Sequence, residues 1–290
     1  MRYWLHGGWT RCSSPEYLTV LDAINARALD PGQGCKDMET LVQAISKTLF
    51  TLFVSFAVMA ASPNAPDPPL PPSGGALVVG EIHGSREVPD LFLALVQDHI
   101  AKDKQPIVAV ELPPSAGTLI CPPLPTNNLP SFWHNPFQDG RTSIAMAELI
   151  CALKTLAANG DLKLLFMDDE SRPGSFDFDA AKRISMLLDG SSKQAFILTG
   201  NFHSRNAPES ISGELAKMGV DTTSVTVGAP KAALWVQMQG DARGSQQSMT
   251  VNFCQAGPDS AIRFTRLESR KWDYCLNFPE MTASPPAQGH

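Results

Sequence analysis

The strongest structural signal in the sequence is Leu77-Val78-Val79-Gly80-Glu81-Ile82-His83-Gly84. An uninterrupted apolar run ends at a glycine, and a carboxylate and an imidazole follow two residues apart. Such runs are typical of strands buried in a parallel sheet, and ligands bind beyond the carboxyl ends of these strands in α/β folds. The stretch therefore predicts a strand that ends at Gly80 and a site that contains Glu81 and His83.

A second Gly-x-x-His pattern follows another apolar run, residues 196–199, and places His203 three residues after Gly200. Between the two copies, the run 106–110 ends at Glu111. The carboxyl ends of parallel strands lie at one edge of a sheet, so side chains far apart in sequence can meet there. The residues expected to converge on one cleft are Glu81, His83, Glu111 and His203.

The remaining pattern predicts the fold class. Apolar residues at helical spacing between the strands, together with a further strand ending at Met167, indicate an α/β domain with a mainly parallel central sheet and helices on both faces. After residue 218 the pattern changes to successive strands without intervening helices, which predicts an antiparallel C-terminal edge. These strands are expected at 222–227, 232–238, 249–254, 261–265 and 272–277.

The paired Gly-x-x-His motifs, with Glu111 between them, resemble the Tiki/TraB/ChaN superfamily. The form Gly-Glu-x-His-Gly at residues 80–84 is also that of the erythromycin esterase branch, and the resemblance spans about residues 77–203. It implies a hydrolase that activates water against an ester or amide bond. In the erythromycin esterase-like version, His83 is the general base, oriented by Glu81 or Glu111, and His203 or Arg141 stabilises the oxyanion.

Two alternatives follow from the same resemblance. The paired motif implies a divalent metal, held by His83, Glu111 and His203, that would lower the pKa of a bound water; Glu81 would then be base or fourth ligand. The ChaN branch is associated with haem or iron uptake, so a haem- or iron-binding protein without catalysis is the third possibility. The sequence leaves all three open.

The segment 112–138 is long and rich in proline, and it ends in an aromatic cluster. Loops of this length in compact domains are usually functional. Phe132, Trp133 and His134 are therefore predicted to form a flap or pocket wall that contacts substrate. Arg141 lies just before a predicted helix, where it suits either a substrate carboxylate or phosphate, or a structural salt bridge.

The N-terminal third predicts export. Residues 49–61 are uncharged and apolar, and their length fits the core of a signal peptide better than a membrane span of about 20 residues. With Met38 as the true start, the expected organisation is an upstream segment, a signal peptide, a Pro-rich linker, one α/β domain and a tail, at 1–37, 38–61, 62–75, 76–280 and 281–290. The alternative is an uncleaved membrane anchor.

Composition and cysteines agree with export. The net charge of −6 offers no basic excess for nucleic acid. Without the leader, an even set of four cysteines remains; Cys254 and Cys275, in neighbouring strands, are predicted to form a disulfide, and Cys151 to be a buried free thiol. We therefore expect a periplasmic or secreted protein with a small-molecule or peptide substrate, and no membrane span in the mature chain.

Overall fold

The computed structural model describes residues 66–102, 104–121, 129–134, 140–168, 176–236, 245–254, 261–269 and 271–287. All of them belong to one compact unit, residues 63–290. The predictions for the upstream segment, the signal peptide and the start of the linker concern residues 1–65, which lie outside the described residues.

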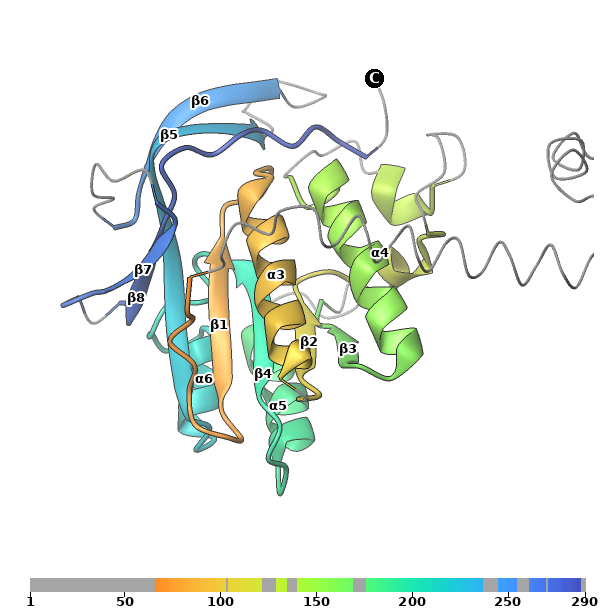
Figure 1. Cartoon of the computed structure of the whole chain (residues 1–290), viewed down its shortest axis with the longest axis vertical. Coiled ribbons are helices and arrows are strands. Elements are labelled where there is room, and N and C mark those ends of the chain that lie inside the picture. Colours follow the sequence, from red (N-terminus) through yellow and green to blue (C-terminus); the bar gives the residue numbers. More distant parts are fainter. Residues whose placement is uncertain are drawn as a thin grey trace, which may run out of the picture. The chain divides into compact units, whose positions relative to one another are not determined.

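Four parallel strands form the centre of the sheet, as the sequence predicts. They are β1 (Ala76–Glu81), β2 (Ile107–Val110), β3 (Lys163–Phe166) and β4 (Ala195–Gly200), and their order across the sheet is β3-β2-β4-β1 (Figure 1). Every residue of β1, β2 and β4 is buried, which explains why these strands read as continuous apolar runs.

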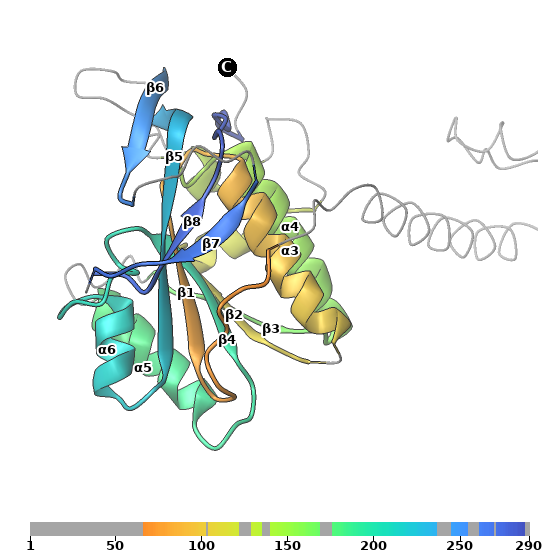
Figure 2. The same cartoon turned by 60° about the vertical axis from the view of Figure 1, so that its left-hand side comes forward.

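Helices cover both faces of this sheet, as predicted. Helices α3 (Glu87–Ala101) and α4 (Ile144–Asn159) lie on one face, and α5 (Phe176–Leu188) and α6 (Ile211–Lys217) lie on the other (Figures 1 and 2). Side chains alternate across a strand, so one β1 residue packs toward α3 and the next toward α5 and α6. Within the described residues, no helix is long and apolar enough to cross a membrane.

The C-terminal edge differs in detail from the prediction. Strand β5 (Thr222–Val236) is one long strand where two were expected, and it runs parallel to β1 and to β8 (Tyr274–Asn277). The antiparallel pairs are β5 with β6 (Ser245–Asn252), and β8 with β7 (Arg263–Arg266). The pairing register of β5 with β6 shifts between Ala229 and Ala232, where Pro230 cannot donate a hydrogen bond to the neighbouring strand. In the sequence, a proline at such a bulge looks like the turn between two strands, which is why two strands were predicted.

Two disulfides link the described cysteines. Cys254 is bonded to Cys275, as the sequence predicts. Cys151 of α4 is bonded to Cys121, so the prediction of a free buried thiol is wrong. The two residues are 30 apart in sequence. The sequence between Cys121 and the start of α4 has no periodic pattern, so it did not predict that the two cysteines lie close together.

The predicted tail is part of the domain as far as residue 287. Its backbone crosses the N-terminal ends of α3 and α4, and the Ser284 N–H donates to the Gly84 carbonyl at 2.8 Å. At α4, the Ile144 N–H donates to the Pro285 carbonyl at 2.8 Å, and the Ala145 N–H donates to Ser284 Oγ at 2.9 Å. The segment thus satisfies helix N–H groups that have no partner within their own helix.

Candidate active site

The strand ends bring the predicted side chains together around Gly200. Glu81, the last residue of β1, is in register with Gly200 of β4. A β-carbon built on Gly200 would lie 3.3 Å from Glu111 Oε2, 3.3 Å from His83 Nε2 and 3.6 Å from His203 Cδ2. Glycine at this position therefore leaves the space in which two imidazoles and a carboxylate face one another.

His83 is held by Glu81. Their side chains share a hydrogen bond of 2.9 Å between His83 Nδ1 and Glu81 Oε1, and the Glu81 side chain is 3% exposed. An ionised carboxylate can only accept, so the Nδ1–H donates and the Nε2 of neutral His83 remains a proton acceptor. Glu81 thus selects the tautomer in which His83 can serve as a base.

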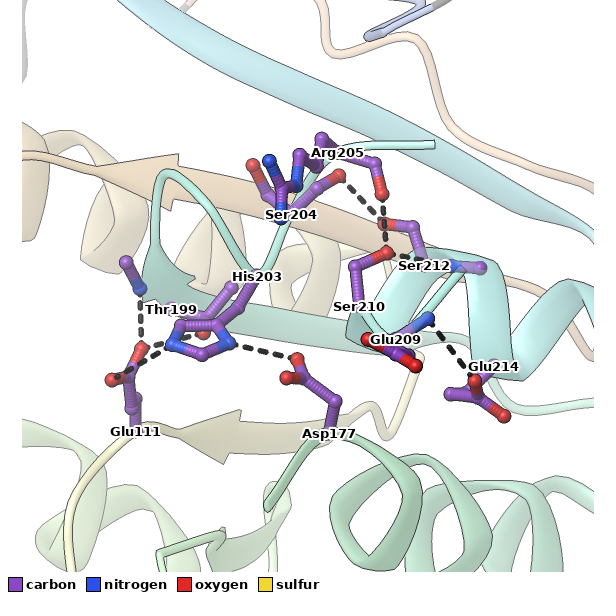
Figure 3. Close-up of polar contacts among 12 residues, drawn as sticks. Glu111, Asp177, Thr199, His203, Ser204, Arg205, Glu209, Ser210, Ser212 and Glu214 are labelled. Carbon is purple, nitrogen blue, oxygen red and sulfur yellow. Dashed lines mark hydrogen bonds and ion pairs between the residues drawn. The ribbon is translucent and has the colours of Figure 1, made fainter. Parts of the chain in front are cut away.

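His203 forms a second pair, with Asp177 in the first turn of α5. The Nδ1–H donates to Asp177 Oδ1 at 2.8 Å, while His203 Nε2 lies 3.8 Å from Glu111 Oε1; Figure 3 shows the imidazole between the two carboxylates. Burial lowers the pKa of His203, but the hydrogen bond to Asp177 and the charge of Glu111 outweigh it and raise this pKa above its ordinary value. His203 therefore favours the protonated, cationic form.

Glu111 is a buried carboxylate with several donors. Its Oε2 accepts from the Thr199 hydroxyl at 2.6 Å and from the Gly200 N–H at 2.5 Å (Figure 3). Burial raises the pKa of Glu111, but the positive charges that His83 and His203 carry when protonated, together with these hydrogen bonds, bring it below its ordinary value. Glu111 therefore stays ionised and is a weak proton acceptor, so its contribution is electrostatic.

Arg141 makes the structural contacts that were one of its two predicted roles. Its guanidinium lies 3.9 Å from Glu111 Oε1 and 3.6 Å from Asp168 Oδ2. The first N–H groups of α4 do not offer an anion site, because the chain itself occupies them: Ser143 Oγ caps the helix by accepting from the Met146 N–H, and the segment 284–285 accepts from the two preceding N–H groups.

The aromatic cluster predicted to contact substrate lies elsewhere. Trp133 is fully buried in the core beside α4, and its indole N–H donates to the Ala116 carbonyl at 3.2 Å. His134 Nε2–H donates to the Leu129 carbonyl at 2.7 Å, and Phe132 packs edge-on against Trp133. The prediction that these residues form a flap is therefore wrong: aromatic side chains in an irregular segment belong here to the core.

The pocket wall comes from a different element. A pocket of about 560 Å³ opens beside the two histidines, and its far side is formed by β6 and the residue after it. The lining includes large apolar side chains that the sequence did not predict, namely Ile82, Phe202, Met249, Val251 and Phe253. Asp177 was also missed, because an acid in the first turn of a helix is ordinary; Phe202, an aromatic inside the second motif, was the one available signal.

The side chains predicted to hold a metal already have other partners. No group of three or more His, Cys, Asp or Glu side chains within the described residues is arranged to hold an ion. Glu111 Oε2 already accepts two hydrogen bonds, and the Arg141 guanidinium lies 3.9 Å from Oε1, where it would repel a cation. The predicted set of His83, Glu111 and His203 thus does not fit a metal in this arrangement. The two imidazoles use their Nδ1 atoms to bond Glu81 and Asp177, and their Nε2 atoms are left for other contacts.

Replacing Asp177 with asparagine is expected to lower the pKa of His203, because the variant loses the charge that favours imidazolium. The wild-type pKa is raised above the ordinary 6.5, so the pair stabilises the fold below that pH and loses this effect as pH rises through the folded-state pKa. The difference in free energy of unfolding between wild type and variant should therefore be larger at about pH 6 than at about pH 9.5.

Proton NMR of the imidazole ring and urea denaturation at both pH values measure the two effects. Asp179→Asn, which removes a charge from the same helical turn, is the matched control and should shift the His203 pKa less. An unchanged pKa in Asp177→Asn would contradict the pairing.

Comparisons with solved structures find distant likenesses with TM-scores below 0.5. No protein-family model matches the chain, and no curated protein does. A solved Bacillus cereus structure aligns with TM-score 0.46 and 10% identity over 73% of this chain and 90% of its own. A succinoglycan biosynthesis protein aligns with a TM-score of 0.48 and 9% identity, over 72% of this chain and 88% of its own. The type III effector HopBA1 aligns with a TM-score of 0.34 and 12% identity, over 64% of this chain and 97% of its own. None of the three bears on the function of this chain.

Proposed function

We propose that the protein is a hydrolase that activates water against an ester or amide bond without a metal. The observation that carries this proposal is the pair of histidines on either side of Gly200, each with its Nδ1 bonded to a carboxylate. One pair suits a general base and the other a hydrogen-bond donor to the developing oxyanion, and hydrolysis needs both roles. The resemblance of the first motif, Gly-Glu-x-His-Gly at residues 80–84, to the erythromycin esterase branch supports the same chemistry.

In the proposed reaction, His83 Nε2 takes a proton from water as the oxygen attacks the substrate carbonyl. The negative charge that develops on the carbonyl oxygen is stabilised by the Nε2–H of protonated His203. The tetrahedral intermediate collapses as its bond to the leaving group breaks, and the proton held by His83 passes to that group. Glu81 and Asp177 keep the two rings oriented, and Glu111 keeps His203 charged.

A second candidate is the binding of haem or iron, as in the ChaN branch, without catalysis. The observation in its favour is that Phe202 and Phe253 line the same pocket as His203, so a planar apolar ligand would find aromatic contacts and an imidazole. This candidate predicts ligand binding without hydrolysis of any ester or amide, and iron ligation by His203 Nε2 would require the neutral imidazole.

We also propose that the protein is exported. The two disulfides support an oxidising compartment, since such bonds seldom persist in the cytosol of mesophiles. Sequencing the N-terminus of protein recovered from the periplasm or medium tests the proposal: a start near residue 62 is expected, whereas an intact Met1 in the membrane fraction would contradict it.

Replacing His203 with glutamine is expected to reduce kcat by about 10²–10³-fold, the usual effect of removing one donor to an oxyanion. The assay begins with a panel of esters, lactones and amides, and with haem titration followed by absorbance. His134→Gln is the matched control, because it makes the same substitution at a histidine whose Nε2–H serves the Leu129 carbonyl outside the pocket.

Elemental analysis of the wild type, before and after dialysis against a chelator, accompanies this assay. The proposal expects hydrolysis to persist without metal. Activity that disappears with a bound transition metal and returns with it would replace the metal-free mechanism. If no member of the panel is hydrolysed while haem binds, the second candidate replaces the hydrolase.

A further inference from the structure

Exposed apolar side chains gather at the mouth of the candidate active site. Phe202 is 61% exposed, Met249 39% and Phe253 38%, and all three line the pocket that contains the histidines. Large apolar side chains that are exposed together, rather than scattered singly, mark a place where another apolar group binds.

The rings of Phe202 and Phe253 are held by their neighbours. The rings of Phe202 and Phe253 meet edge-on with centroids 6.1 Å apart, and Phe253 meets Trp272 at the same separation. The Arg205 guanidinium lies 5.5 Å from the centroid of the Phe202 ring. The residue after Phe253 is disulfide-bonded to β8, so the wall is a preformed surface and little order is lost when a ligand packs on it.

The apolar surface and the catalytic cluster are parts of one pocket. Phe202 is next to His203 in sequence, and Ile82, which also lines the pocket, is next to His83. A volume of about 560 Å³ lies in the range of pockets that enclose small organic ligands. The described lining contains neither lysine nor arginine, and its two carboxylates outnumber the one histidine, His203, that favours the cationic form; this charge balance disfavours an anionic substrate and suits an uncharged one.

Resting on the hydrolase function proposed above, we propose that the site selects uncharged esters or amides with a bulky apolar group on one side of the scissile bond. That group packs on the surface formed by Phe202, Met249 and Phe253 while the carbonyl lies between the two histidines. The three residues thus determine specificity, whereas the histidine pairs perform the reaction.

The test compares methyl octanoate and octyl acetate with methyl acetate, so that the long group is placed on either side of the bond. At least one of the two long-chain esters is expected to have a higher kcat/KM than methyl acetate. The ratio of its kcat/KM to that of methyl acetate is expected to fall about tenfold in Phe202→Ser and in Met249→Ser. Met186→Ser, which replaces an exposed methionine of α5 outside the pocket, is the control and should leave the ratio unchanged.

A binding arm removes the dependence on turnover. Calorimetry with 2-decanone, an uncleavable ketone with a long alkyl chain, should give about tenfold weaker binding in both pocket variants than in wild type or Met186→Ser. If esters are hydrolysed but neither ratio nor ketone affinity responds to the pocket variants, this inference is overturned and the hydrolase stands. If the ketone binds as expected while no ester or amide is hydrolysed, the pocket stands as an apolar binding site and the hydrolase fails.

Discussion

Replacing Glu81 with glutamine is expected to lower turnover by about 10²–10⁴-fold, the range of general acid–base catalysis. Glutamine keeps the size of the side chain, but its NH₂ group can donate to His83 Nδ1 and so favour the tautomer that carries a proton on Nε2. His83 would then have no lone pair directed at water. The loss should appear in kcat, measured on any hydrolysed ester, with 2-decanone affinity nearly unchanged.

The companion variants show whether Glu81 acts through His83. His83→Gln removes the base itself and should cost at least as much, and the double variant should be little worse than His83→Gln alone, because residues that act as a unit give non-additive losses. Full additivity would mean that Glu81 acts independently, and undiminished turnover in Glu81→Gln would remove the proposed base.

Replacing Gly84 with alanine is expected to lower the free energy of unfolding by about 3–5 kcal/mol, a large part of the stability of a typical domain. Gly84 has φ +86°, a conformation that L side chains rarely adopt, and a β-carbon there would overlap the Trp235 backbone. That backbone cannot retreat freely, because the Trp235 N–H donates to the Gly84 carbonyl at 3.1 Å. Urea denaturation followed by circular dichroism measures the loss.

Gly160→Ala separates the two causes. Gly160 ends α4 with φ +84°, nearly the same backbone conformation, but no atom lies within 4 Å of a β-carbon built there. This variant should therefore show only the backbone cost, about 1–2 kcal/mol. Equal losses in the two variants would mean that the contact with Trp235 does not constrain the loop after His83.

The central sheet could be predicted from sequence because each parallel strand is buried on both faces and is therefore continuously apolar. Because each apolar run stops where its strand ends, the sequence also predicted that the residues at these ends lie close together. These residues are Glu81, His83, Glu111 and His203. The course of β5 could not be predicted, because a proline bulge inside a strand and a turn between two strands have the same composition.

The surroundings of the site were less predictable. Asp177 reaches His203 because α5 begins beside the strand ends, and its sequence context is that of any acid at a helix start. The aromatic residues 132–134 suggested a binding surface, but aromatic side chains serve core and ligand equally, and only the fold decides between them. The pocket wall comes from β6, whose exposed residues have no distinctive sequence pattern.

The loop after His83 is bonded by the segment 281–287, which is synthesised much later than the loop itself. The Gly84 carbonyl, one residue beyond His83, accepts from the Trp235 N–H and from the Ser284 N–H. The loop after the first motif is therefore completed by a residue that is synthesised 200 positions later. A nascent chain that stops short of residue 284 carries His83 on an unfinished loop, so the base can be fixed in place only once residue 284 has emerged.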